Sequence, residues 1–166
     1  MEFTKIIGVV KMESKRMINI SSDISLSDAI VCEITNCKND ITVNFSEHGG
    51  FFKKDKNNGK YYRTSKSSLI LKDCNIDDIS IKEIRMHKIS EGLYCETMMD
   101  ISLCDFLSNI NSGEYTFEFV EEFYNSGKAL FIGYVKKDDD HFWCHIKLSC
   151  GDIVCYWKEL KYDMPY

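Results

Sequence analysis

The sequence predicts an α+β domain, mostly antiparallel β-sheet with two short helices. Three observations lead to this fold class. Short β-branched or apolar runs bounded by polar turns recur along the chain. Segments with apolar residues at helical spacing are few and short. Most intervals between the predicted strands are also too short for the helical crossovers that parallel strands require.

The predicted strands share a period of two or a short apolar core between turn residues. In chain order they are "KIIGVV" at 5–10, "RMINI" at 16–20, "ITVNF" at 41–45, "SLILKD" at 68–73 and "ISIKEIRMHKI" at 79–89. The clearest strand is "EYTFEFV" at 114–120. There Tyr115, Phe117 and Phe119 face one way, and the alternate residues give the strand an acidic outer face.

Two segments have helical spacing. In "SLSDAIVCEITNC", residues 25–37, the apolar residues follow a helical period behind Ser25 as a possible N-cap, although β-branched residues weaken the pattern. In "SLCDFLSNINSG", residues 102–113, Ser102 can cap an apolar stripe and Gly113 can end it. We therefore expect one short helix in each segment.

The composition is that of a compact globular protein, with 44% apolar and 13% aromatic residues. We expect a single domain over residues 1–166, because no linker rich in Pro, Gly or Ser interrupts the chain. The N-terminal segment has charges on both sides of a short apolar run, which fits neither a signal peptide nor a membrane span. We therefore expect a cytoplasmic protein whose eight cysteines are reduced.

The stretch "HFWCHIKLSCGDIVC", residues 141–155, concentrates two histidines and three cysteines. We interpret it as one arm, the turn and part of the second arm of a hairpin with a Cys150-Gly151 loop. This register pairs Leu148 with Ile153, Ile146 with Cys155, and Cys144 with Trp157. The cysteines of the strands then lie on an apolar face, away from His141 and His145. We therefore expect buried thiols and no metal or other cofactor.

A basic hairpin is predicted around Asn58-Gly59, a strong turn signal. It carries Lys53, Lys54, Lys56, Lys60, Arg63 and Lys66 among Phe51, Phe52, Tyr61 and Tyr62. Cations interleaved with aromatics suit single-stranded nucleic acid. The same pattern also fits a solvated hairpin whose aromatics alternate into the core, and the sequence pI near 5.4 favours this second interpretation.

The sequence shows few features that would indicate catalysis. His48, His87, His141 and His145 could each supply an acid or base, but no spacing pairs them. The sequence contains no G-x-S-x-G or H-E-x-x-H motif. We therefore expect a protein without enzymatic activity and name no catalytic residue.

The C-terminal part of the chain is acidic. Residues 96–166 hold 6 Lys and Arg against 13 Asp and Glu, whereas residues 1–95 hold 15 against 13. Because the strands after residue 114 are sequential, several carboxylates are expected along one edge or end of the sheet. Such a field would attract a basic protein, although the same residues could simply protect exposed edges or keep the protein soluble. The predicted partner contacts are Glu118, Glu121, Glu122, Asp138, Asp139 and Asp140.

The segment "KALFIGYVKKDDDHFWCHIKLSCGDIVCYWKEL" consists of consecutive strands ending in Tyr156-Trp157. With the small size, the acidity and the abundance of Lys, Asn and Ile, it resembles immunity proteins of polymorphic toxin systems, including contact-dependent growth inhibition. The resemblance implies an inhibitor that binds and masks a cognate basic toxin domain, often a nuclease. Two alternatives stay open: a nucleic-acid binder or nuclease using residues 53–66, and a viral or bacterial interaction domain that neither neutralises a toxin nor catalyses a reaction.

Overall fold

The computed structural model describes residues 13–17 and 23–166, and its strands form two antiparallel sheets. The larger sheet has the order β1-β13-β7-β4-β3-β10-β11-β12-β8-β9, and the smaller has the order β14-β6-β5-β2. The predicted mostly antiparallel fold is therefore confirmed. No helix in the described part of the chain has the length and apolar character needed to cross a membrane.

The strands of the larger sheet are β1 (Glu13–Met17), β3 (Ile30–Cys37), β4 (Asp40–Phe45), β7 (Ser68–Lys72), β8 (Ser80–Ser90), β9 (Leu93–Ile101), β10 (Thr116–Asn125), β11 (Lys128–Lys137), β12 (Asp140–Ser149) and β13 (Asp152–Trp157). The smaller sheet contains β2 (Ile24–Ser25), β5 (Phe52–Lys54), β6 (Tyr61–Ser65) and β14 (Glu159–Pro165). A single helical turn, η1 (Ile76–Asp78), and one helix, α1 (Leu103–Asn111), complete the described elements. The predicted strand at 5–10 lies outside the described residues, as do residues 18–20 of the next.

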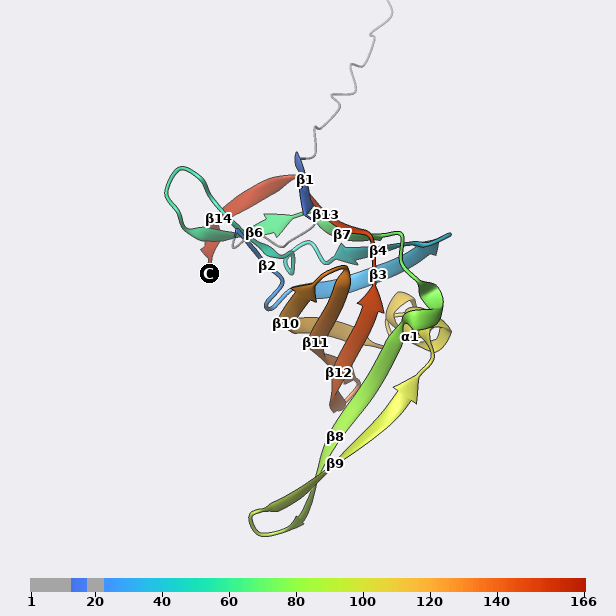
Figure 1. Ribbon diagram of the computed structural model, residues 1–166. Coiled ribbons are helices and arrows are strands. Elements are labelled where there is room, and N and C mark those ends of the chain that lie inside the picture. Colours follow the sequence, from blue (N-terminus) through green and yellow to red (C-terminus); the bar gives the residue numbers. More distant parts are fainter. Residues whose placement is uncertain (1–12, 18–22) are drawn as a thin grey trace, which may run out of the picture.

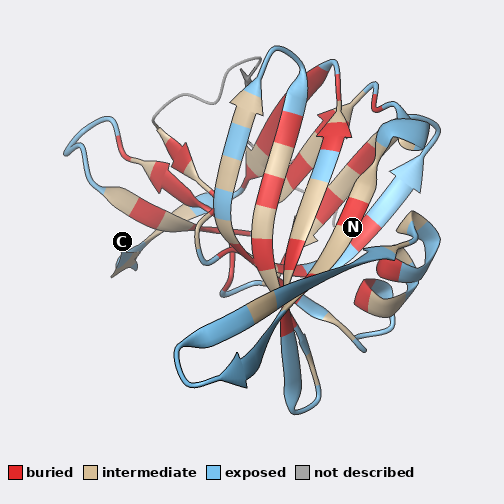
Figure 2. Ribbon diagram, turned by 60° about the horizontal axis from the view of Figure 1, so that its bottom comes forward, coloured by how far each residue is buried: buried red, intermediate tan, exposed pale blue. Residues whose placement is uncertain are grey.

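The core lies on the inner face of the larger sheet, which twists so that β3 and β4 cross β10, β11 and β12 at a wide angle (Figure 1). Buried and more exposed residues alternate along several strands, as the period of two requires (Figure 2). In β10, Phe117 and Phe119 are buried and their rings are 4.9 Å apart. This confirms the predicted faces of that strand.

Helix α1 confirms one of the two predicted helices. The Ser102 hydroxyl accepts a hydrogen bond from the Asp105 backbone N–H at 3.0 Å, and Gly113 adopts a positive φ of 78° just past the helix. The helix buries Phe106 and Ile110, and the Phe106 ring lies 5.9 Å from that of Phe117. Helix α1 therefore extends the aromatic core of the sheet.

The predicted helix at 25–37 is wrong. The segment forms β2, a turn and β3, because Asp28 takes a positive φ of 59° and the β-branched residues that follow suit a strand. Leu26 and Ala29 are fully buried at the turn, and the Ala29 N–H donates to the Leu26 carbonyl at 2.8 Å. The apolar spacing that indicated a helix therefore comes from a buried turn.

The predicted hairpin between residues 141–149 and 152–160 is also wrong. Strand β12 pairs with β11 and β8, whereas β13 pairs with β7 and β1. The Gly151 N–H donates to the Lys72 carbonyl at 2.8 Å, which directs the chain toward β7. The predicted side of each cysteine was nevertheless correct, since Cys144 and Cys155 are fully buried. Periodicity decides which face a residue occupies, but it does not select the partner strand.

Candidate protein-binding surface

The outer face of β10, β11 and β12 carries a row of side chains ordered by strand register. Glu118 lies opposite Tyr134, and Tyr134 lies opposite Trp143. The two aromatic rings stack with centroids 3.7 Å apart and planes tilted by 35°. Both side chains are partly exposed. This aromatic pair offers a rigid, half-exposed apolar surface beside a carboxylate.

Asp138 and Asp139 form the two-residue turn between β11 and β12, since Lys137 pairs with Asp140 in register. Asp138 has a positive φ of 50°, which Asp tolerates better than most residues. Both turn aspartates are exposed. We call Asp138, Asp139 and Asp140 the acidic turn.

The cations near the acidic turn are mostly committed to other carboxylates. Lys136 Nζ lies 2.8 Å from Glu118 Oε2, and Lys137 Nζ lies 2.5 Å from Glu114 Oε1. The ion pair with Glu114 raises the pKa of Lys137, so this lysine stays charged. Among the described residues, no ion pair joins Asp138 or Asp139 to a cation. The two turn aspartates therefore stay exposed without an ion pair to any described residue, although Lys137 interacts electrostatically with Asp138.

Asp140 differs from its two neighbours. Its carboxylate receives two hydrogen bonds from the Arg85 guanidinium, at 2.9 Å from Nη1 and 2.7 Å from Nη2. Arg85 also pairs with Glu83 and lies over the Phe142 ring, 5.0 Å from its centroid. The hydrogen bond from Arg85 holds the pKa of Asp140 below its usual range. Asp140 thus anchors the acidic turn to β8.

Two shallow hollows flank the acidic turn. The first, which we call the acidic hollow, has a volume of about 510 Å³. It is lined by Glu118, Tyr134, Lys136, Asp138, Asp139, Asp140 and His141. The second, of about 540 Å³, lies beside Arg85 and Tyr115. A partner side chain can therefore reach the turn from either side.

The last two predicted contacts, Glu121 and Glu122, follow a β-bulge in β10 and point to opposite sides of the sheet. The register of β10 against β11 shifts between Phe119 and Glu121, which reverses the inward and outward positions beyond the bulge. Glu121 is exposed, whereas Glu122 accepts a hydrogen bond from the Leu26 backbone N–H at 2.9 Å. Burial raises the pKa of Glu122. The structure thus brings Glu118 together with the acidic turn and turns Glu122 toward the protein interior.

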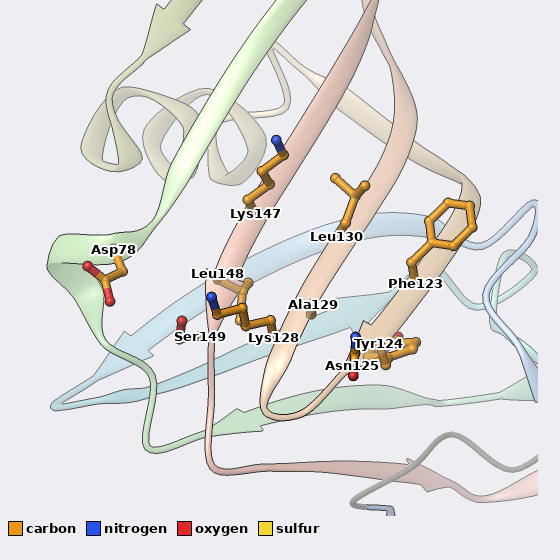
Figure 3. Close-up of a pocket in the computed structure, with 10 residues that line it drawn as sticks. All are labelled: Asp78, Phe123, Tyr124, Asn125, Lys128, Ala129, Leu130, Lys147, Leu148 and Ser149. Atoms are coloured by element: carbon orange, nitrogen blue, oxygen red, sulfur yellow. The ribbon is translucent and has the colours of Figure 1, made fainter.

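Sequence reasoning missed a groove at the other end of the same outer face. It has a volume of about 760 Å³, and Phe123, Leu130 and Lys147 rise from neighbouring strands into it (Figure 3). Phe123 is 52% exposed, while Lys128 and Asp78 lie on the groove's rim. Only the bulge in β10 turns Phe123 outward, so no alternating pattern could indicate it.

The basic hairpin is confirmed as β5 and β6, but its cations and aromatics are only partly accessible. Lys53 is buried, and its ammonium donates to the Lys54 carbonyl at 2.7 Å. Arg63 donates to the carbonyls of Asp28 and Gly50 and lies 4.3 Å from the Phe52 ring centroid. The rings of Phe51, Phe52 and Tyr62 are buried, so they offer no open platform for stacking bases.

The histidines and cysteines do not gather into one site, although His141, Cys144 and His145 share β12 and His87 lies opposite Cys95. His87 hydrogen-bonds with Thr97 at 2.8 Å, and His48 Nδ1 lies 3.2 Å from Lys161 Nζ. Burial raises the pKa of the Cys144 thiol to about 12, so it is protonated at neutral pH. Within the described ranges, no three His, Cys, Asp or Glu side chains are grouped so that they could hold a metal ion.

Comparisons with protein-family models, curated proteins and solved structures found no match to this chain. The outer face of β10, β11 and β12 is therefore the basis of the proposed function.

Proposed function

We propose that this chain is a non-catalytic binding protein that captures a basic protein through the acidic turn and the adjoining Tyr134–Trp143 pair. In line with its resemblance to immunity proteins, we propose that the partner is a toxin domain, which the chain masks and neutralises. The observation that carries the proposal is the position of the exposed Asp138 and Asp139, which form no ion pair among the described residues, beside the half-exposed Tyr134–Trp143 stack.

The charges and the aromatic pair would contribute to different steps of binding. Exposed carboxylates raise the association rate of a basic partner, because they attract it over a distance of about one Debye length, roughly 8 Å at physiological salt. Partly exposed Tyr and Trp side chains are common energetic anchors in interfaces, since they bury much area with little loss of conformational entropy. An acidic rim next to an aromatic anchor is therefore suited to fast and durable capture.

Capture from the source organism tests this function. The full chain would be immobilised and compared with Asp138→Lys/Asp139→Lys. The charge-matched control is Glu47→Lys/Asp163→Lys, which changes two exposed acids elsewhere. We expect the wild type and the control to retain the same basic protein and the double turn variant to lose it. Equal retention by all three proteins would contradict the proposed surface.

The toxin part of the proposal has its own test. The captured protein would be expressed alone and together with this chain in a host that lacks both. We expect growth arrest with the partner alone and recovery on co-expression. A partner that is harmless alone would overturn the neutralising function while leaving the binding surface intact.

A further inference from the structure

The hairpin of β8 and β9 stands away from the body of the protein (Figure 1). Strand β12 supports β8 only from Ser80 to Ile84, so the hairpin beyond Ile84 has no other paired strand in the described structure. Large apolar side chains, each more than half exposed, lie along this hairpin, four of them beyond Ile84 and two on the part of β9 opposite Glu83 and Ile84. They are Met86, Ile89, Leu93, Tyr94, Met98 and Met99. Several exposed large apolar side chains on one hairpin are typical of an interaction surface.

Strand β9 is the last strand of the larger sheet, and β8 is its only partner among the described strands. Its outer edge therefore presents backbone N–H and C=O groups that can pair with another strand. Natural edge strands are often protected by charged side chains, especially Lys, by Pro or by a bulge, and β9 carries only the two acids Glu96 and Asp100. The sequence of β9, "LYCETMMDI", contains neither Lys nor Pro, and its register is regular from Tyr94 to Ile101. This edge is open to pairing.

We propose that β9 pairs antiparallel with β9 of a second copy of this chain, with Thr97 of both copies facing each other on a twofold axis. Thr97 is the midpoint of Leu93–Ile101, so this register uses the whole strand. In it, Cys95 faces Met99 of the second copy, and Leu93 faces Ile101. The odd-numbered face of β9 has no charged residue, so the two strands form a continuous uncharged stripe.

The two carboxylates of β9 disfavour the two neighbouring registers. With Thr97 on the axis, Glu96 faces Met98 of the second copy and Asp100 faces Tyr94. Moving the axis to residue 96 would place Glu96 opposite Glu96, and moving it to residue 98 would place Glu96 opposite Asp100. Like charges directly opposite one another destabilise a strand pair. In addition, Lys82 of the same copy forms an exposed ion pair with Asp100 at 2.5 Å.

This pairing would join the two larger sheets into one continuous sheet. Opposed residues in an antiparallel pair lie on the same face, and each residue here faces one of the same parity. The outer faces of both copies, and hence both acidic turns, would lie on the same side of the joined sheet. A dimer would therefore bind two partner molecules from one side, an arrangement that goes beyond the proposed function of a single copy.

Sedimentation of the purified full chain over a concentration series tests the dimer. We expect a monomer–dimer equilibrium in the wild type. Thr97→Lys places two ammonium groups opposite one another and is expected to raise the dimer Kd by at least about tenfold. Thr35→Lys is the matched control, because Thr35 is also exposed but lies in an interior strand, β3. The control should dimerise like the wild type.

Disulfide trapping tests the register. In a background with the exposed Cys32, Cys37 and Cys104 and the partly exposed Cys95 changed to Ser, Thr97→Cys should cross-link rapidly to a covalent dimer, and Thr35→Cys should not. A monomeric wild type at all concentrations would overturn the proposal. Dimerisation that is unaffected by Thr97→Lys, with no preferential cross-linking at residue 97, would also overturn it. If Thr97→Lys instead weakens binding of the basic partner to a monomeric wild type, the edge belongs to that partner and the proposal is wrong.

Discussion

Arg85 holds Asp140 with two parallel hydrogen bonds, so the three consecutive aspartates of the acidic turn are not equivalent. Asp140 has its charge compensated and ties the turn to β8. Asp138 and Asp139 keep their charges directed at solvent. One sequence motif therefore contains both a structural ion pair and the residues proposed to attract a partner.

Asp140→Asn should lower the thermal stability at neutral pH, whereas Asp138→Asn should leave it nearly unchanged. The hydrogen bond from Arg85 lowers the pKa of folded Asp140, so the ion pair stabilises the fold above the pKa of the unfolded chain. That stability is lost as the pH falls through the lowered pKa. Thermal unfolding of both variants at several pH values checks this. A stability difference between wild type and Asp140→Asn that persists in strong acid would contradict it.

Glu122→Gln should have the opposite pH signature. Burial raises the pKa of Glu122, so the folded state favours its protonated form and loses stability as the pH rises through that pKa. Gln keeps an oxygen that can accept from the Leu26 N–H. We expect Glu122→Gln to be more stable than the wild type at neutral pH, with the difference vanishing in acid. Denaturant unfolding along a pH series measures it, and a less stable variant at neutral pH would contradict the argument.

Phe106→Ala should destabilise the protein by about 3–5 kcal/mol, because it removes a fully buried ring and leaves a cavity between α1 and β10. Phe123→Ala is the matched control. That ring is 52% exposed, so its removal should cost about 0.5 kcal/mol or less. Chemical denaturation of the two variants compares them directly, and equal losses would show that α1 is not docked as described.

The local parts of the fold were predictable from sequence. The Ser102 cap, the apolar stripe and Gly113 indicated α1, and alternation indicated β10 and the buried sides of Cys144 and Cys155. Long-range pairing was not predictable, because period and turn residues do not specify that β13 joins β7 rather than β12. The helix predicted at 25–37 was wrong because the buried turn residues Leu26 and Ala29 have the same spacing as the apolar residues of a helix.

The candidate surface was predictable to a similar degree. The charge distribution indicated Glu118 and the acidic turn, and sequential strands do bring them into one hollow. The bulge between Phe119 and Glu121 has no clear sequence signal, so the inward orientation of Glu122 and the exposure of Phe123 were missed. The role of Arg85 was also hidden, because its partner is distant in sequence.

Tyr134→Ala or Trp143→Ala should accelerate dissociation of the captured partner by about 30-fold, as expected for loss of an interface anchor worth about 2 kcal/mol. The association rate should change little, because neither variant alters charge. Tyr162→Ala is the matched control, since the exposed Tyr162 packs against Tyr62 in the smaller sheet with ring centroids 4.8 Å apart. Surface plasmon resonance separates the two rates. An effect of Tyr162→Ala as large as that of Tyr134→Ala would contradict the assignment of the anchor.

The association rate of the captured partner as a function of salt tests the central claim most directly. Stopped-flow measurements would compare the wild type, Asp138→Lys/Asp139→Lys and the control Glu47→Lys/Asp163→Lys. We expect the wild-type rate to fall steeply with added salt. The turn variant should associate at least about tenfold more slowly at low salt and lose most of that dependence. Identical rates and salt slopes for the turn variant and its control would show that the acidic turn does not receive the partner.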